Sequence, residues 1–536
     1  MINFAQFGSR KIFRPAPEVE AWIRTGAEKH LRSRFQPGEY QGRDRANEVI
    51  KHQFQFYERL LNNALPSLLE RGSVEFLLSQ FDEASELLHG NGILDLAERE
   101  KWRRIEPFFK RGIKYLVERI CLMTANSWTP TEPRQSMLAI NVAMVCAEVL
   151  SHMAQESDLV FSIFPEHGTA SVLPPGQVVH CNIHVTGRHS EYAERFSARL
   201  RRDRQHRDKR VAWPPFAHHT ETHQRYLDSV FQTEFGMTYG HFIHVITQTI
   251  TNSHPSLEPN AFETLFISRN RLVAGLVEVS GQTQSAIERA LDGFTIRSEN
   301  LEQEQRVITK PKQTHRAFRR GFFLMPHEDG PHLCFSRAMA RENLINMCGA
   351  VAFQKLPPEW TTEATKRALS DLSRAAGRWF EQVLTDRLHE IGIQGSGVTR
   401  RLGSGSPALE IPPDVGQIDF LGFHKGGNLI VVIEAKMVSG ALEPATWRDE
   451  LHDFLGEKKY ADRFRRKIRW VEKNRQEITR ALGVDSNSRV VAALVTYYPS
   501  IVAEFIHDFP CVSLAELILD FEKVRGWPYP PPALAS

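Results

Sequence analysis

The sequence predicts a multi-domain α/β protein in which a mainly helical N-terminal region precedes a C-terminal mixed sheet flanked by helices. Its 536 residues are enough for about two to four domains that each bury a core. Apolar residues between about 49 and 150 recur at helical spacing, whereas those between 415 and 521 form short runs rich in valine and isoleucine. Such runs are typical of strands buried on both faces, which is why we expect the sheet near the C-terminus.

The N-terminal pattern predicts amphipathic helices from Val49 to Leu150, with a largely buried helix over Met137 to Met153. Prolines, glycines and short β-branched runs from Leu159 to Thr186 indicate strands or extended loops. Pro357-Pro358 precedes Thr362, a suitable helix N-cap with Glu363 in the first turn. We therefore expect a helical region at 1–155, a mixed region at 156–356 with a polar linker near 299–320, and a third domain at 357–536. A fragment that begins near residue 355 is expected to fold alone.

The overall composition excludes several classes of protein. The net charge is only +3, so any nucleic-acid contact must come from local basic patches. None of the six cysteines forms a C-x-x-C pair, which argues against a zinc ribbon and against a disulfide framework. The first ten residues lack an apolar signal core, and no continuous apolar segment approaches the length of a membrane span. We expect a cytoplasmic protein without a membrane partner.

Two acidic residues and a lysine stand at the ends of predicted strands. The apolar run Leu429 to Ile433 ends in Glu434-Ala435-Lys436, and Glu434 and Lys436 share a face because residues two apart in a strand point the same way. Gly426-Gly427 indicates a two-residue hairpin with positive φ at both glycines, preceded by a strand over Val415 to Phe423. If paired residue numbers sum to 853, Asp419 lies opposite Glu434, with the Cβ atoms roughly 5 Å apart.

This trio predicts phosphodiester chemistry. Asp419 and Glu434 supply the oxygen ligands that Mg²⁺ prefers, and Mn²⁺ can substitute for it. Lys436 can orient or help deprotonate the attacking water and offset charge on the phosphate. Because deleting a carboxylate relieves like-charge repulsion, we expect Asp419→Ala and Glu434→Ala to leave the fold intact. A surface hairpin with an Asp/Glu/Lys ion-pair cluster is the structural alternative.

An aspartate followed by a strand that ends in Glu-x-Lys resembles the core pattern of the PD-(D/E)XK nuclease superfamily. The helical pattern from Gly377 through Glu381 to Gly392 is similar to the first core helix of its resolvase-like branch. Downstream, a long basic helix, a strand at Arg489 to Thr496 and a short strand and helix through Cys511 to Phe521 continue the family order, so the resemblance extends over about residues 363 to 525. It implies a restriction-endonuclease-like domain at 357–536, with Glu381 as a third acidic metal ligand. Asp419, Glu434, Lys436 and Glu381 would then be the catalytic residues.

The function expected from this resemblance is a Mg²⁺-dependent phosphodiesterase that hydrolyses DNA, an endonuclease rather than an exonuclease, with a role in bacterial defence against foreign DNA. RNA stays open as a substrate, and a homo-oligomer or a partner protein is compatible with the fold. One alternative is a non-catalytic nucleic-acid-binding or scaffold protein that retains a nuclease fold. Another is a helical interaction protein in which this domain is an appendage.

Two basic segments are candidates for phosphate contacts. Lys458 to Arg480 holds ten Lys or Arg against three acidic residues, and Arg463, Arg466, Lys467 and Lys473 surround an apolar stripe of Phe464, Ile468 and Val471. Arg195 to Arg210 holds eight against two. For both segments a solvated helix face is the alternative. His219 and His223 have helical metal-pair spacing, but without an H-E-x-x-H pattern we interpret them and His218 as ordinary polar or core residues.

Overall fold

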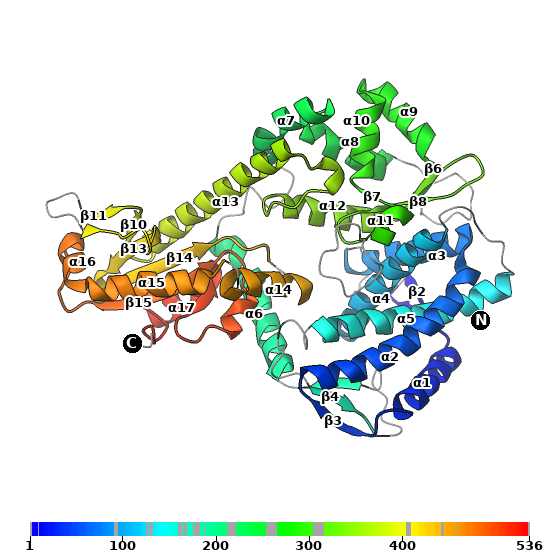
Figure 1. Cartoon of the computed structure of the whole chain (residues 1–536), viewed down its shortest axis with the longest axis horizontal. Helices are drawn as coiled ribbons and strands as arrows, with labels where there is room; N and C mark the ends of the chain where they lie inside the picture. The colour runs from blue at the N-terminus through cyan, green and yellow to red at the C-terminus, as the bar shows by residue number, and fades with distance from the viewer. Residues whose placement is uncertain are drawn as a thin grey trace. The chain divides into compact units, whose positions relative to one another are not determined.

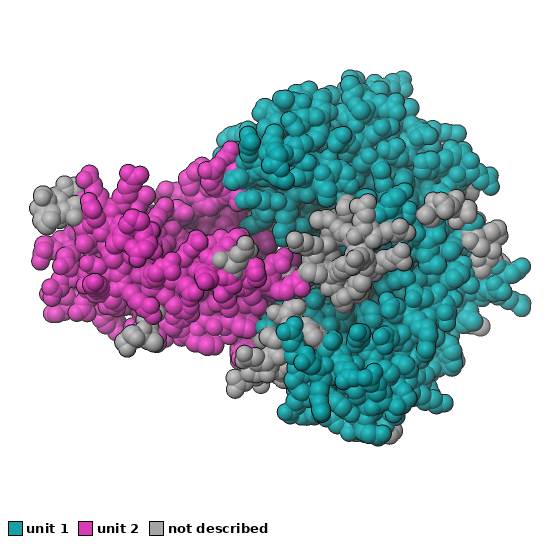
Figure 2. Space-filling model, in the orientation of Figure 1, with its two compact units in different colours: residues 1–187, 216–370 teal, residues 188–215, 371–536 magenta. Residues whose placement is uncertain are grey.

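The computed structural model describes two compact units, each built from two separate segments of the chain (Figure 2). Unit 1 comprises Met1–Gly187 and Phe216–Ser370, and unit 2 comprises Arg188–Pro215 and Asp371–Ser536. The described residues run from 3 to 533, without residues 9, 90–94, 125–127, 129–131, 159–162, 164–168, 175–182, 187, 212–220, 253–264, 304–315, 404–408, 441–443 and 457. The three regions predicted from the sequence are therefore not separate, consecutive domains. Residues 1–155 and most of 156–356 form one unit, and residues 188–215 join the C-terminal region in the other.

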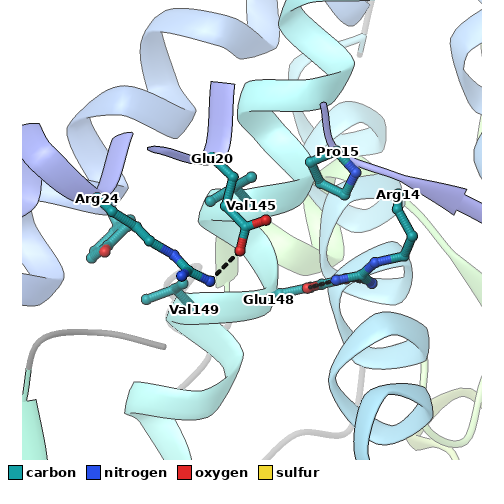
Figure 3. Close-up of a pocket in the computed structure, with 8 residues that line it drawn as sticks. Arg14, Pro15, Glu20, Arg24, Val145, Glu148 and Val149 are labelled. Carbon is teal, nitrogen blue, oxygen red and sulfur yellow. Dashed lines mark hydrogen bonds and ion pairs between the residues drawn. The ribbon is translucent and has the colours of Figure 1, made fainter. Parts of the chain in front are cut away.

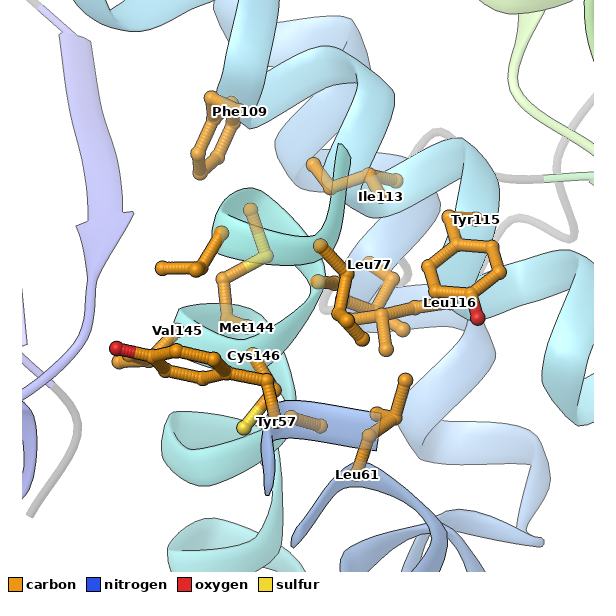
Figure 4. Packing of buried hydrophobic residues seen from close by; sticks show 14 of the residues in the cluster. Tyr57, Leu61, Leu77, Phe109, Ile113, Tyr115, Leu116, Met144, Val145 and Cys146 are labelled. Carbon is orange, nitrogen blue, oxygen red and sulfur yellow. The ribbon is translucent and has the colours of Figure 1, made fainter. Parts of the chain in front are cut away.

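The first segment of unit 1 is mainly helical, as predicted. Its helices are Pro17–Arg32 (α1), Arg43–Ala64 (α2), Arg71–His89 (α3), Leu96–Met123 (α4) and Pro133–Asp158 (α5), and its strands are Asn3–Phe7 (β1), Arg10–Arg14 (β2), Gly38–Gln41 (β3), Thr169–Val172 (β4) and Ile183–Thr186 (β5). Side chains from α2, α3, α4 and α5 interdigitate in the core, among them Tyr57, Leu77, Phe109 and Met144 (Figure 4). The predicted buried helix over 137–153 is confirmed as part of α5. This helix is long and apolar enough to cross a membrane, yet 78% of its apolar window is buried inside the structure.

The second segment of unit 1 packs a small sheet against helices. It contains Glu221–Phe235 (α7), Tyr239–Asn252 (α8), Leu265–Ser268 (β6), Arg269–Ser280 (α9), Gln284–Asp292 (α10), Thr295–Ile296 (β7), Ser298–Gln303 (α11), Phe322–Met325 (β8), His332–Phe335 (β9) and Arg337–Val351 (α12). Strand order is β6-β9-β8-β7. Phe323 and Cys334 of this sheet belong to the same apolar core as α2 to α5, which is why the two predicted regions form one unit. Most of the predicted polar linker near 299–320 lies outside the described residues.

Unit 2 is a mixed sheet flanked by helices (Figure 1). Its elements are Arg188–Arg210 (α6), Glu363–Glu390 (α13, whose first turns belong to unit 1), Ile393–Val398 (β10), Arg401–Leu402 (β11), Leu409–Glu410 (β12), Ile418–His424 (β13), Leu429–Lys436 (β14), Pro444–Leu451 (α14), Tyr460–Lys473 (α15), Arg475–Leu482 (α16), Arg489–Thr496 (β15), Cys511–Ser513 (β16) and Leu514–Val524 (α17). In the main sheet, ordered β10-β13-β14-β15-β16, the first three strands are antiparallel, and β15 and β16 run parallel to β14. Helix α13 begins at Glu363, as predicted, and Thr362 Oγ1 accepts the N–H of Thr365.

The alternation of side chains along β14 explains how helices cover both faces of this sheet. Val431 and Ile433 pack in one apolar cluster with Phe380 of α13 and Leu517 of α17. Ile430 and Val432 point the other way, into a cluster that contains the α15 stripe of Phe464, Ile468 and Val471. Glu434 and Lys436 continue the second set along the strand. Their functional groups therefore lie on the α15 side, at the end of the strand.

The turn between β13 and β14 corrects one detail of the prediction. The register is the predicted one, since Phe420 pairs with Ile433 and His424 with Leu429, both sums being 853. Gly426 and Gly427, however, do not carry the positive φ. They lie in a 3₁₀ turn closed by the bond from the Asn428 N–H to the Lys425 carbonyl, and Asn428 takes the left-handed conformation at φ 48°. Asparagine tolerates this region better than most residues, so the turn reverses the chain without changing the register.

Helix α6 corrects the interpretation of the basic segment at 195–210. Its arginines are ion-paired with acidic residues of the C-terminal segment: Arg195 with Glu504, Arg199 with Glu516 and Arg202 with Asp520. Asp203 is fully buried and accepts a hydrogen bond from the Ser513 hydroxyl. With the pair between Arg207 and Asp203, four of the eight basic residues at 195–210 are ion-paired within the protein, so this helix is a built-in part of unit 2.

Candidate active site

Strands β13 and β14 bring Asp419 and Glu434 together. The observed register, extended by one residue beyond the Phe420–Ile433 pair, sets them opposite each other, as predicted. Both side chains are buried, with 8% of Asp419 and 3% of Glu434 exposed. Buried carboxylates are costly unless a cation or hydrogen bonds compensate them, so their partners define the site.

Lys436 lies between the two carboxylates. Its ammonium nitrogen is 2.7 Å from Glu434 Oε1 and 3.3 Å from Asp419 Oδ2, and it also donates to the Ala435 carbonyl at 3.0 Å. Asp419 Oδ2 accepts the Ala435 N–H at 2.9 Å, which fixes the carboxylate against β14. Burial alone would lower the pKa of Lys436, but the charges of Glu434 and Asp419 outweigh burial and raise it above its ordinary value. Lys436 is therefore a cation at neutral pH.

Lys467 is a member of this site that the sequence analysis assigned elsewhere. We predicted it among the basic residues around the apolar stripe, but the structure places it inside that stripe, buried against the site. Only 6% of Lys467 is exposed, and its ammonium pairs with Glu434 Oε2 from α15. One signal could have found it: Phe464, Lys467, Ile468 and Val471 follow the i, i+3, i+4, i+7 spacing of a buried helix face, so the lysine stands inside the apolar stripe.

Glu381, the predicted third acidic residue, is half-buried on α13. Its pKa is raised, first by burial and then by the negative charge of Asp419, while Lys436 opposes the shift. The charges of the site therefore act on Glu381, although it comes from a helix of the opposite sheet face. A cation beside such a carboxyl would stabilise its ionised form and so lower its pKa again.

The other predicted phosphate contacts lie on the outside of α15 and near its end. Arg463, Arg466 and Lys473 are exposed, and Arg466 Nε donates to the Asp414 carbonyl at 3.2 Å. Their neighbour Arg465 is held by Asp508 and Asp462. The structure thus leaves three of the four predicted residues at the surface of unit 2.

The donor set of this site fits a hard divalent cation. Glu381, Asp419 and Glu434 carry three negative charges against the two positive charges of Lys436 and Lys467. All candidate ligand atoms are carboxylate oxygens, which are the ligands of Mg²⁺ and Mn²⁺ rather than of softer metals. The two ammonium groups pair with the two carboxylate oxygens of Glu434. A bound cation would free both lysines for other anionic partners, such as phosphate.

Unit 1 contains two further groups of charged residues among the described residues. A small pocket lined by Arg14, Tyr57, Val145 and other residues has its charges satisfied internally, since Arg14 forms a two-pronged pair with Glu148 at 2.6 and 3.1 Å and Arg24 pairs with Glu20 (Figure 3). The second group, absent from the sequence analysis, is His327, Asp329 and His332, whose donor atoms converge in one loop.

Among the three histidines named from the sequence, His223 is buried in α7, as expected of a core residue. His218 and His219 lie outside the described residues.

Comparison of the chain with protein-family models, with curated proteins and with solved structures gives no match.

Proposed function

We propose that unit 2 is a Mg²⁺-dependent nuclease of the restriction-endonuclease-like class, acting in the cytoplasm on DNA. The observation that carries the proposal is the convergence of Asp419, Glu434 and Lys436 at one end of two adjacent buried strands. The order of elements supports it: helix α13, the antiparallel strands β10, β13 and β14, helix α15 and the parallel strand β15 follow the order that the sequence resemblance implies.

In this proposal Asp419 and Glu434 hold the cation, with Glu381 as a further ligand. When bound, the cation acts as a Lewis acid toward the phosphate and lowers the pKa of water. Lys436 lies beside both carboxylates and would hold the attacking water and a non-bridging phosphate oxygen. Lys467 would offset the charge that grows on the phosphate, because its partner Glu434 is then engaged by the cation. Both roles need the lysines to remain protonated, which agrees with the raised pKa of Lys436.

The alternative is a scaffold that binds nucleic acid without cleaving it. One observation favours it: both carboxylate oxygens of Glu434 are paired with lysine ammonium groups, as in a purely structural ion-pair cluster. The two candidates differ in whether a divalent cation binds at the cluster and whether cleavage depends on it.

The decisive test is cleavage by the purified full-length protein. Supercoiled plasmid, linear duplex, single-stranded DNA and RNA are incubated with Mg²⁺, Mn²⁺ or a chelator. We expect nicking of the plasmid with Mg²⁺ or Mn²⁺ and none with the chelator. Lys436→Ala, purified identically, should be about 10²–10³-fold slower, the usual cost of removing one group that stabilises a transition state. Cleavage at the wild-type rate in Lys436→Ala would indicate a contaminating nuclease. A wild-type protein that binds no metal and cuts no substrate would favour the scaffold.

The basic surface of α15 gives a separate prediction. Replacing Arg463, Arg466 and Lys473 with alanine should weaken DNA binding alike for all sequences. It should also reduce the slope of log affinity against log salt by about 0.9 for each phosphate that the helix no longer neutralises. The measurement is fluorescence anisotropy over a range of salt concentrations. The matched control replaces three exposed basic residues of unit 1, Arg45, Lys51 and Arg103, with alanine. Equal slopes in both triple variants would assign the α15 surface to solubility.

A further inference from the structure

The loop between β8 and β9 in unit 1 gathers three side chains with metal-binding groups. His327, Asp329 and His332 each offer one donor atom, and these atoms all lie within 4.8 Å of one another. His332 Nε2 is 3.6 Å from Asp329 Oδ1, and His327 Nδ1 is hydrogen-bonded to the same oxygen. A single ion can therefore be reached by two imidazoles and a carboxylate after small side-chain adjustments.

The backbone of the loop explains this convergence. The Gly330 N–H donates to the His327 carbonyl at 3.1 Å, which closes a turn around Glu328 and Asp329. Gly330 has φ 110°, a conformation that other residues rarely adopt. The turn brings the two histidine rings together with centroids 4.1 Å apart and planes 41° from parallel, so residues five positions apart meet at one point.

His332 is also oriented as a ligand. Its Nδ1 lies 3.0 Å from the Gly330 carbonyl oxygen, and a carbonyl can only accept, so Nδ1 carries the proton. The lone pair of the neutral ring is then on Nε2, the atom that faces Asp329. Metal-binding histidines commonly donate their second ring nitrogen to a carbonyl in this way.

An aromatic ring supports the same histidine. Phe266 of β6 lies against His332 with centroids 5.3 Å apart and planes 28° from parallel. The guanidinium of Arg71 lies 4.7 Å from the centre of the Phe266 ring and is paired with Glu75 at 2.6 Å, which offsets its positive charge. The site is thus held on one side by an apolar ring and a neutralised ion pair.

We propose that His327, Asp329 and His332 bind a divalent transition-metal ion of the Zn²⁺ or Co²⁺ kind. Imidazole nitrogen favours these ions over Mg²⁺, which distinguishes this site from the all-carboxylate cluster of unit 2. Three protein ligands leave a position for water or a substrate group, as in open zinc sites, and the ion would fasten the loop between β8 and β9. The site is independent of the nuclease proposal because it lies in the other unit.

The test uses full-length protein freed of metal with a chelator, to which Co²⁺ is added stepwise. We expect a visible absorption band that saturates and that excess Zn²⁺ removes. His327→Gln and Asp329→Asn should each weaken binding by more than the roughly 10–100-fold that loss of an outer-shell partner causes. Asp419→Asn, which alters the unit 2 cluster, should leave the band unchanged, as should the matched control His244→Gln on the exposed face of α8.

The two ligand variants are chosen because Asp329 is exposed and His327 partly so, whereas His332 is buried in the sheet. Circular dichroism should show that both remain folded. If wild-type protein gives no band, or gives one that persists in both variants, the three residues form only a hydrogen-bonded turn and the proposal fails.

Discussion

Glu434→Ala is expected to abolish cleavage and also to destabilise unit 2 by about 3–5 kcal/mol. From the sequence, we expected Glu434→Ala to leave the fold intact because it removes the repulsion between two carboxylates. The ion pairs of Glu434 with Lys436 and Lys467 reverse that expectation. Removing Glu434 leaves the buried ammonium of Lys467 without the carboxylate that it contacts. The free energy lost by breaking this buried pair is far larger than the free energy gained by relieving the repulsion between the carboxylates. Urea unfolding and plasmid cleavage, measured on the same preparation, check the two effects.

Two companion variants separate catalysis from folding. Glu434→Leu combined with Lys467→Met should recover most of the stability that Glu434→Ala removes, because apolar residues of similar size replace both charges, but should remain inactive. Asp419→Asn should be inactive with a small change in stability, since Lys436 keeps its 2.7 Å contact with Glu434. Wild-type stability in Glu434→Ala, or cleavage in either Glu434 variant, would contradict the geometry on which the site is built.

A fragment of residues 355–536 is expected to be unfolded or insoluble, contrary to the expectation from the sequence. Without α6, Glu516 loses Arg199, which contacts it through Nε at 2.7 Å and Nη2 at 2.8 Å and which also donates to the Cys511 carbonyl. The fragment would also lack Phe196, whose ring packs against Trp447, and Val211, which belongs to the apolar cluster that contains Phe380 of α13. Residues 188–215 joined to 371–536 by a long Gly/Ser linker should restore a cooperative unfolding transition.

Point variants of the full chain test the same contact without truncation. Arg199→Ala should destabilise unit 2 by about 3–5 kcal/mol, as expected for a broken buried pair. The matched control, Arg201→Ala on the exposed face of the same helix, should change stability by less than about 0.5 kcal/mol. A 355–536 fragment that unfolds with the same cooperativity and midpoint as the intact unit would show that α6 is dispensable.

Local patterns predicted the sheet of unit 2 well. The strand at Arg489–Thr496, the N-terminus of α13 and the β13–β14 register all follow from residues close in sequence, and the register from the apolar run and its glycine turn. The positive φ was assigned to the wrong residues because the glycine pair also fits a 3₁₀ turn followed by a left-handed asparagine.

Long-range packing was not accessible in this way. Composition alone describes α6 as a solvated basic helix, and its acidic partners are some 300 positions further along the chain, as the pair Arg199–Glu516 shows. Lys467 was misplaced because its charge was counted without regard to the apolar stripe that contains it. His327, Asp329 and His332 were missed because only helical metal-pair spacing was considered, whereas their convergence depends on a turn at Gly330.

The interleaving of the two units has a consequence for the inheritance of this protein. Residues 216–370 are an insertion within the chain of unit 2, and residues 188–215 are an insertion within the chain of unit 1. A single recombination breakpoint between 188 and 370 would therefore leave at least one unit with mismatched parts of two parents, which must still fit one another. A protease that cuts there would nick the chain without releasing an intact unit. Neither unit can be exchanged as a contiguous cassette, so we expect the two to have been inherited together, with substitutions in α6 tracking those around Glu516.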